Sequence, residues 1–291
     1  METSTDGSEE RITPSFVCFL TWTFILVARP QDYLNVMMAI RPVVVISIIT
    51  LLAMFLEARR TSRPFFHLTE VRLIFALFIV MIAGIPFAVH RGVAFRFVFT
   101  AMPTLIMYFI VCILQLRSLR RFNITAGIVM ISVLFAASFY MKDALANIGV
   151  RTVANQAYDP NDIAIVFITC IPLCLYILVS KQHVLMKILA TAAAFLATAG
   201  IMLSGSRGGF LAFALVAVLF ILGRTHGIKT FSKVIIIILL AFVFFNYFSV
   251  VEGRFQNIGD DYNITDPNGR FHIWKQNMAI IAHNPILGAG A

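Results

Sequence analysis

The sequence predicts an all-α protein, a polytopic bundle of transmembrane helices. Hydrophobic residues make up 60% of the chain and charged residues 13%, against about half and about a quarter in ordinary soluble domains. The mean hydropathy is +0.89. The apolar residues form runs that suit helices crossing a hydrocarbon core of about 30 Å, and these runs lack the alternation of barrel strands.

These runs give about nine candidate spans, of which the first, second and eighth are short. The predicted spans are 16–27, 43–56, 73–89, 97–116, 122–140, 163–179, 188–203, 210–222 and 234–251. We therefore expect residues 1–251 to form the membrane-embedded region and residues 252–291 to begin a large loop outside it.

The basic residues indicate how the bundle is oriented, because loops rich in Lys and Arg stay in the cytoplasm. With a cytoplasmic N-terminus, the inner loops carry twelve basic and two acidic residues, whereas the outer segments carry ten basic and eight acidic residues. We expect a bacterial inner-membrane protein whose residues after Val251 lie in the periplasm.

The outer loop after the ninth span contains a predicted amphipathic helix. Asp266 and Pro267 form a typical helix start, and Trp274, Met278 and Ile281 recur at a helical interval. We expect this helix to end before Pro285 and to rest on membrane lipids at the outer interface, as such helices do.

The net charge of +9 does not indicate a nucleic-acid partner, because the basic residues are scattered singly between apolar runs. The four cysteines also lie inside apolar runs and have no zinc-site spacing. Cys170 and Cys174 share a helix face, but such a pair is more often packing than a metal site. We therefore predict no metal and no nucleic acid.

The stretch 204–209, Ser-Gly-Ser-Arg-Gly-Gly, lies between two spans on the predicted outer side. Glycines allow a ligand to approach the backbone, and the start of a helix favours an anion. Arg207 adds a planar, charged group that suits phosphate oxygens. The alternative interpretation is a tight hairpin whose arginine reaches lipid headgroups, and the residues themselves favour neither.

Two acidic residues before the sixth span, Asp159 and Asp162, invite interpretation as a general base. Asp159 directly precedes Pro160 and an apolar run, which is typical of a helix cap. Capping is the preferred interpretation of Asp159.

Several motifs, in the order in which they follow one another along the chain, resemble those of the O-antigen ligase and polymerase family. Two earlier pieces resemble its exosortase-associated O-glycosylation ligase subgroup. The family motifs are 206–209 (Ser-Arg-Gly-Gly), 269–274 (Gly-Arg-Phe-His-Ile-Trp) and 283–290 (His-Asn-Pro-Ile-Leu-Gly-Ala-Gly), and the subgroup pieces are 29–31 (Arg-Pro-Gln) and 158–162 (Tyr-Asp-Pro-Asn-Asp).

The resemblance implies a membrane glycosyltransferase that moves a glycan from an undecaprenyl diphosphate carrier to a lipid or protein acceptor, without a cofactor. It implies that Arg207 and Arg270 bind the diphosphate, with Arg151 as a weaker third candidate. The residues expected to shape the loop are Gly205, Ser206, Gly208 and Gly209.

The family-like region covers about 188–291, and the resemblance implies a catalytic histidine in a part of the outer loop beyond Ala291. His272 and His283 do not match its position. We therefore expect the sequence to be truncated at its C-terminal end. The alternatives are a transporter or lipid-linked glycan flippase and a non-catalytic membrane protein. A transporter should carry ionisable groups near mid-membrane, whereas the charges here lie at span ends.

Overall fold

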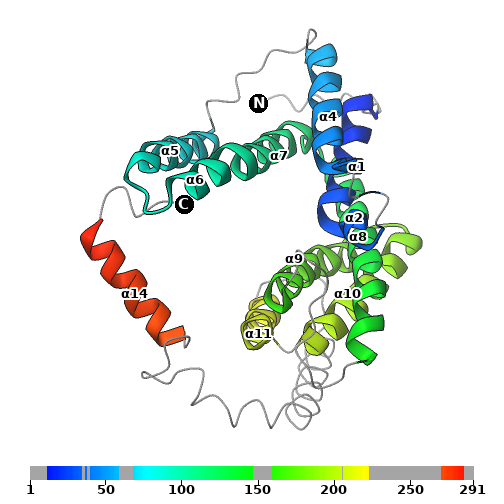
Figure 1. Ribbon diagram of the computed structural model, residues 1–291. Coiled ribbons are helices and arrows are strands. Elements are labelled where there is room, and N and C mark those ends of the chain that lie inside the picture. Colours follow the sequence, from blue (N-terminus) through cyan, green and yellow to red (C-terminus); the bar gives the residue numbers. More distant parts are fainter. Residues whose placement is uncertain are drawn as a thin grey trace.

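The computed structural model describes residues 12–34, 37, 40–58, 68–146, 159–204, 206–222 and 270–284. Within these ranges every regular element is a helix, which confirms the predicted all-α fold (Figure 1). The elements are α1 (Pro14–Ala28), α2 (Pro30–Tyr33), α4 (Pro42–Ala58), α5 (Thr69–Gly84), the 3-10 helix η2 (Ile85–Phe87), α6 (Arg91–Arg96), the π-helix η3 (Phe97–Ala101), α7 (Met102–Gln115), α8 (Leu119–Ala146), α9 (Pro160–Val179), α10 (Val184–Ser204), α11 (Arg207–Leu222) and α14 (Arg270–His283).

Eight of the predicted spans coincide with these helices, and the ninth, 234–251, lies outside the described residues. In the described part of the chain, five helical segments are long and apolar enough to cross a membrane, namely Thr69–Phe87, Arg91–Gln115, Leu119–Lys142, Pro160–Val179 and Val184–Ser204. The three shorter apolar helices correspond to the runs predicted to be short. The chain is therefore a multi-pass membrane protein, while the total of nine spans stays a prediction.

The larger apolar core lies where α8, α9 and α10 pack together. Gly200 of α10 permits this contact, since a Cβ at that position would lie 2.2 Å from the ring of Phe167 on α9. The Phe167 ring also packs at 6.0 Å, between centroids, from the ring of Tyr140 on α8. This core fixes α9, the helix that will support the candidate site.

A second apolar cluster joins α1, α4 and α7. Trp22 is fully buried there, and its ring meets the Tyr108 ring edge-on at 5.3 Å between centroids. The Tyr108 hydroxyl also lies 3.0 Å from the Thr23 hydroxyl. The two clusters are linked through α1, which packs against both α4 and α8.

A polar network holds four helix ends together at one end of this bundle. Arg121 at the start of α8 donates from Nη1 to Gln115 Oε1 over 2.8 Å, and Gln115 Nε2 donates to Ser15 Oγ over 2.9 Å. Ser15 Oγ donates in turn to Glu57 Oε2 over 2.5 Å. The start of α1, the ends of α4 and α7 and the start of α8 therefore lie together, as alternating spans require.

Large apolar side chains also face outward from the helices. Leu56 of α4 is 71% exposed and Ile79 of α5 is 64% exposed. Many other large apolar side chains of the described helices are exposed as well, which is unusual for a soluble monomer, and lipid is the environment that suits them.

The last described helix, α14, stands apart from the other helices in Figure 1. The predicted helix is confirmed from Arg270 to His283, while Asp266 and Pro267 lie outside the described residues. The structure agrees less well with the prediction that this helix has a single apolar face. Trp274, Met278 and Ile281 are exposed on one side, but Ile273 and Ile280 are exposed too and fall on another side at about 100° per residue. Its position at the interface stays a prediction.

Candidate functional site

The turn between α10 and α11 is held by two serines. Ser204 Oγ donates to the Ile201 carbonyl over 2.7 Å and accepts from the Ser206 N–H over 3.1 Å. Ser206 Oγ accepts from the Gly209 N–H over 3.0 Å, while its carbonyl accepts from the Phe210 N–H over 2.9 Å. Ser206 is therefore the N-cap of α11, a role for which serine is well suited.

The start of α9 is capped in the same way. Asp159 Oδ1 accepts from the N–H groups of Asn161 and Asp162 over 2.6 and 2.8 Å, and Pro160 occupies the first helical position. This geometry confirms the capping interpretation of Asp159. Asp162 lies in the first turn with an exposed side chain.

A hydrogen bond joins these two helix starts. Ser206 Oγ donates to Asn161 Oδ1 over 2.7 Å, although the residues are 45 positions apart in the sequence. Ser206 is only 3% exposed, so its hydroxyl is shielded from water. The start of α11 is thus fixed to the start of α9, and the two motifs that contain Asn161 and Ser206 lie side by side.

The two glycines after Arg207 have different surroundings. A Cβ on Gly209 would lie 2.6 Å from the Cβ of Ala164, so this glycine is needed for the close approach of α11 to α9. A Cβ on Gly208 would meet nothing within 4 Å, and Gly208 is exposed. One glycine therefore closes the helix contact, and the other leaves open space beside the first turn of α11.

The electrostatics of this turn favour an anion. Backbone dipoles give a helix start a partial positive charge, and no acidic residue lies in the first turn of α11. Ser206 binds the Gly209 and Phe210 N–H groups, whereas the Arg207 and Gly208 N–H groups lie where a helix offers no internal partner. The first turn of α11 therefore has two N–H groups without a helical partner and open space beside Gly208.

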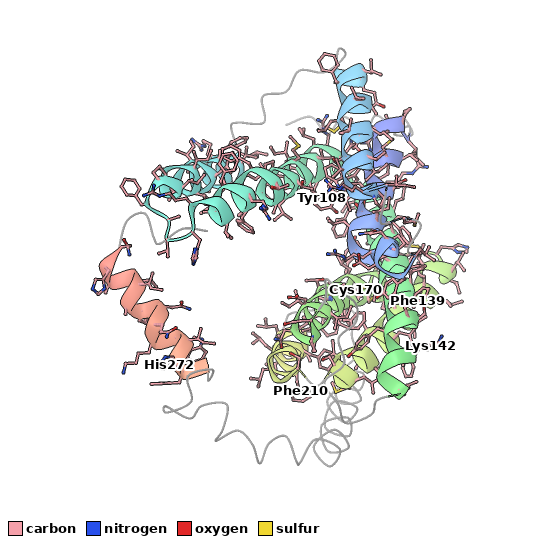
Figure 2. The ribbon with its side chains drawn as sticks, in the orientation of Figure 1. Tyr108, Phe139, Lys142, Cys170, Phe210 and His272 are labelled. Atoms are coloured by element: carbon pink, nitrogen blue, oxygen red, sulfur yellow. The ribbon has the colours of Figure 1, made fainter. Side chains whose placement is uncertain are left out.

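The predicted arginines are only partly placed. Arg207 begins α11 and Arg270 begins α14, but the side chains of both lie outside the described part of the structure, as do Arg151 and Gly205 entirely. Figure 2 shows His272 on α14 apart from Phe210 on α11. The structure therefore brings Ser206, Gly208 and Gly209 together with the start of α9, while the pairing of Arg207 with Arg270 stays a prediction.

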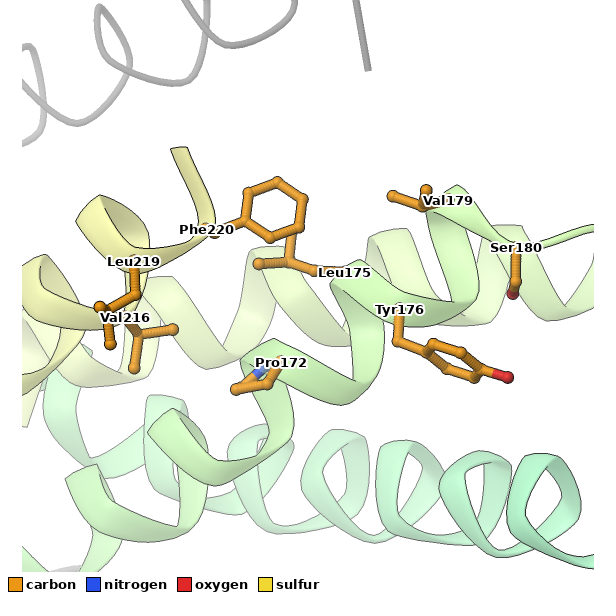
Figure 3. Close-up of a pocket in the computed structure, with 8 residues that line it drawn as sticks. All are labelled: Pro172, Leu175, Tyr176, Val179, Ser180, Val216, Leu219 and Phe220. Carbon is orange, nitrogen blue, oxygen red and sulfur yellow. The ribbon is translucent and has the colours of Figure 1, made fainter. Parts of the chain in front are cut away.

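An apolar groove with a volume of about 570 Å³ runs between the later turns of α9 and α11 (Figure 3). Pro172, Leu175 and Val179 line it from α9, and Val216 and Phe220 line it from α11. The two helices are in contact at their starts through Ala164 and Gly209. No charged side chain lines the groove among the described residues, so it suits a hydrocarbon chain.

The cysteines of α9 and the histidines of α14 make only local polar contacts among the described residues. The Cys170 and Cys174 sulfurs lie 3.6 Å apart as free thiols in the main core. His272 Nε2 lies 2.9 Å from Gln276 Nε2, and His283 Nδ1 donates to the Ala279 carbonyl over 2.8 Å. Across the ranges described, no group of three His, Cys, Asp or Glu residues could hold a metal ion.

Fold and site together define a multi-pass helical membrane protein with an anion-favouring helix start beside an apolar groove. Residues 192–291 match the family model described as O-antigen ligase. This match covers about the last third of the chain and includes the whole Ser206 turn. No curated protein and no solved structure matches the chain in the corresponding searches. The subgroup resemblance stays an expectation.

One residue of this site was not singled out by the sequence analysis. Asn161 lies in a motif noted for its resemblance, but nothing in its local pattern connects it to Ser206. A usable signal did exist, because spans six and eight run in the same direction across the membrane and their starts must share one side. The Asn161 amide, in the first turn of span six, could then meet the Ser206 hydroxyl, which directly precedes span eight.

Proposed function

We propose that this protein transfers a glycan from an undecaprenyl diphosphate carrier to a hydroxyl of a lipid or protein acceptor on the periplasmic side of the inner membrane. The O-antigen ligase match supports membrane glycosyltransferase activity in general. The carrier, the acceptor and the side of the membrane are our proposal.

The observation that carries the proposal is the Ser206-capped start of α11. It offers two backbone N–H groups and the open side of Gly208 to an anion, and it lies inside the matched region. A diphosphate needs this kind of partner, because its departure leaves negative charge that fixed donors stabilise. Arg207, at the first position of α11, is proposed to supply a bidentate charged contact.

Arg270 and Arg151 are proposed as further diphosphate ligands. Arg270 begins a helix, α14, that is largely exposed, so it is proposed to reach the site when the donor is bound. Arg151 lies nine positions before Pro160, the first residue of α9, and the start of α9 is bonded to Ser206. This position in the sequence supports the proposal that Arg151 lies near the start of α11.

The hydrocarbon part of the donor is proposed to lie along α9 and α11. Their apolar groove begins a few helical turns below Ser206 and has a volume of about 570 Å³. A carrier whose diphosphate sits at the start of α11 could therefore extend its chain into this groove.

In the proposed reaction, the acceptor oxygen forms a bond to the anomeric carbon of the donor sugar. The bond from that carbon to the diphosphate oxygen breaks, and the hydroxyl proton passes to a base. The residues proposed to bind the diphosphate stabilise the charge on the leaving group. The donor carries its own activated bond, so the proposal includes no metal or nucleotide cofactor.

The test measures glycan transfer from undecaprenyl diphosphate-linked donor by protein expressed from its complete natural gene. Arg207→Lys keeps the charge but loses the bidentate geometry. Losing one charge-assisted contact costs about 1.5–3 kcal/mol, which corresponds to a roughly tenfold to hundredfold lower rate. Arg270→Lys should fall in the same range.

Arg117→Lys is the matched control, because Arg117 is exposed at the opposite end of the bundle. Arg121 would be unsuitable, since its guanidinium bonds Gln115 and lies 4.9 Å from the centre of the Phe16 ring. Full transfer by Arg207→Lys and Arg270→Lys at matched expression would refute the diphosphate assignment and leave both arginines as headgroup anchors.

A further inference from the structure

Three hydrogen bonds form a continuous chain from the cap of α9 to the cap of α11. The Asn161 N–H donates to Asp159 Oδ1 over 2.6 Å, which fixes the backbone of Asn161. Ser206 Oγ donates to Asn161 Oδ1 over 2.7 Å. The Gly209 N–H donates to Ser206 Oγ over 3.0 Å. The cap of one helix is therefore oriented by a side chain from the other.

Ser206 needs this partner because of the hydrogen bonds that a hydroxyl can make. A serine hydroxyl has one hydrogen and two acceptor sites. One acceptor site takes the Gly209 N–H, and the hydrogen goes to Asn161 Oδ1. With Ser206 only 3% exposed, water is a poor replacement for that acceptor. Without Asn161, only the Gly209 N–H would hold Ser206 in the side-chain rotamer that places Oγ as the cap of α11.

The side chain of Asn161 is also oriented by this bond. Its oxygen faces Ser206, so its amide nitrogen faces elsewhere, and no hydrogen bond joins that nitrogen to the described residues. Among the described residues, Ser206 is the hydrogen-bond partner of the Asn161 side chain. The bond to Ser206 connects Asn161 to the helix start that the serine caps.

We propose that Asn161 is a positioning residue for the anion site at the start of α11. It locks the Ser206 hydroxyl as the cap, and this lock aligns the Arg207 and Gly208 N–H groups and the root of the Arg207 side chain toward the donor's diphosphate. The inference rests on the proposed function, because it takes the diphosphate as the ligand of this turn.

The test is a double-mutant cycle in full-length protein in lipid nanodiscs, with undecaprenyl diphosphate as the titrated probe. Asn161→Ala should weaken binding by about threefold to tenfold, the range expected for one lost hydrogen bond. Ser206→Ala should weaken it at least as much, because it removes both bonds. If Asn161 acts through Ser206, the double variant should bind no worse than Ser206→Ala alone.

Two further measurements separate positioning from a general loss of structure. In transfer assays, Asn161→Ala should raise the KM for the lipid-linked donor and leave the KM for the acceptor unchanged. Thr169→Ala is the control on the same helix, since Thr169 is exposed and its hydroxyl bonds only the Val166 carbonyl. This variant should match wild type in both KM values.

The outcomes distinguish this inference from the proposed function. Unchanged binding in Arg207→Ala and Ser206→Ala would overturn the diphosphate site and the role of Asn161 together. Weaker binding in those two variants with unchanged binding in Asn161→Ala would overturn only the role of Asn161. The positioning role would also be overturned if the losses of affinity in the two single variants multiplied in the double variant. An equal rise of the KM values for donor and acceptor would overturn it too.

Discussion

Gly209 lies so close to Ala164 that a Cβ on the glycine would come within 2.6 Å of the alanine Cβ. Neither atom belongs to a flexible side chain, so an added methyl group cannot move aside without shifting a helix. The contact between α9 and α11 therefore depends on glycine at this position.

The first prediction compares the two neighbouring glycines. Gly209→Ala should lower the free energy of unfolding by about 1–3 kcal/mol, the usual range for overpacking. Gly208→Ala should match wild type or exceed it slightly, because nothing lies within 4 Å of the added Cβ. Thermal unfolding of the purified variants in one detergent checks this, and equal midpoints for both variants would contradict the helix contact.

The second prediction concerns the polar network at the opposite end of the bundle. Glu57 accepts from both the backbone N–H and the hydroxyl of Ser15, over 2.9 and 2.5 Å. Glu57→Ala should therefore destabilise the protein by about 1–3 kcal/mol, as expected when charged hydrogen bonds are removed. Glu70→Ala is the control, since Glu70 is exposed in the first turn of α5.

Thermal unfolding in detergent also measures this pair of variants. A Glu57→Ala midpoint indistinguishable from that of Glu70→Ala would show that the network contributes nothing to stability. The network joins four helix ends that the orientation prediction puts in the cytoplasm.

The helices were predictable because their signals are local. Runs of apolar residues of membrane length gave eight helices in the described ranges, and they also identified which three are short. The Asp159 cap was predictable for the same reason, since a carboxylate followed by proline at a helix start needs no distant partner. Such features depend on a few neighbouring residues.

The geometry of the site depends on how helices pack, which local patterns do not contain. The sequence treats Gly208 and Gly209 alike, but only Gly209 faces Ala164. Asn161 and Ser206 meet because of the rotation of α9 relative to α11, and no periodicity within either helix determines that rotation. The groove along Val216 and Phe220 likewise results from the arrangement of two helices.

The third prediction tests whether Asp159 is a cap or a catalytic base. Asparagine caps helices about as well as aspartate, whereas alanine costs about 1 kcal/mol. Asp159→Asn should therefore keep near wild-type glycan transfer and stability, while Asp159→Ala should lower the unfolding midpoint. A fall in transfer of about a hundredfold or more in Asp159→Asn, with stability intact, would instead identify a general base.

The last prediction concerns the orientation of the protein in the membrane, which follows from the bias of basic residues between loops. Gly208 is exposed at the start of α11, whereas Arg117 is exposed between α7 and α8, at the end of the bundle that carries the Glu57 network. In a background without the four native cysteines, Gly208→Cys should react with an impermeant thiol reagent in cells whose outer membrane alone has been permeabilised. Arg117→Cys should react only after the inner membrane is broken. The reverse pattern would place Arg207 in the cytoplasm, away from any periplasmic donor, and would refute the proposed side of the reaction while leaving the helix contacts unchanged.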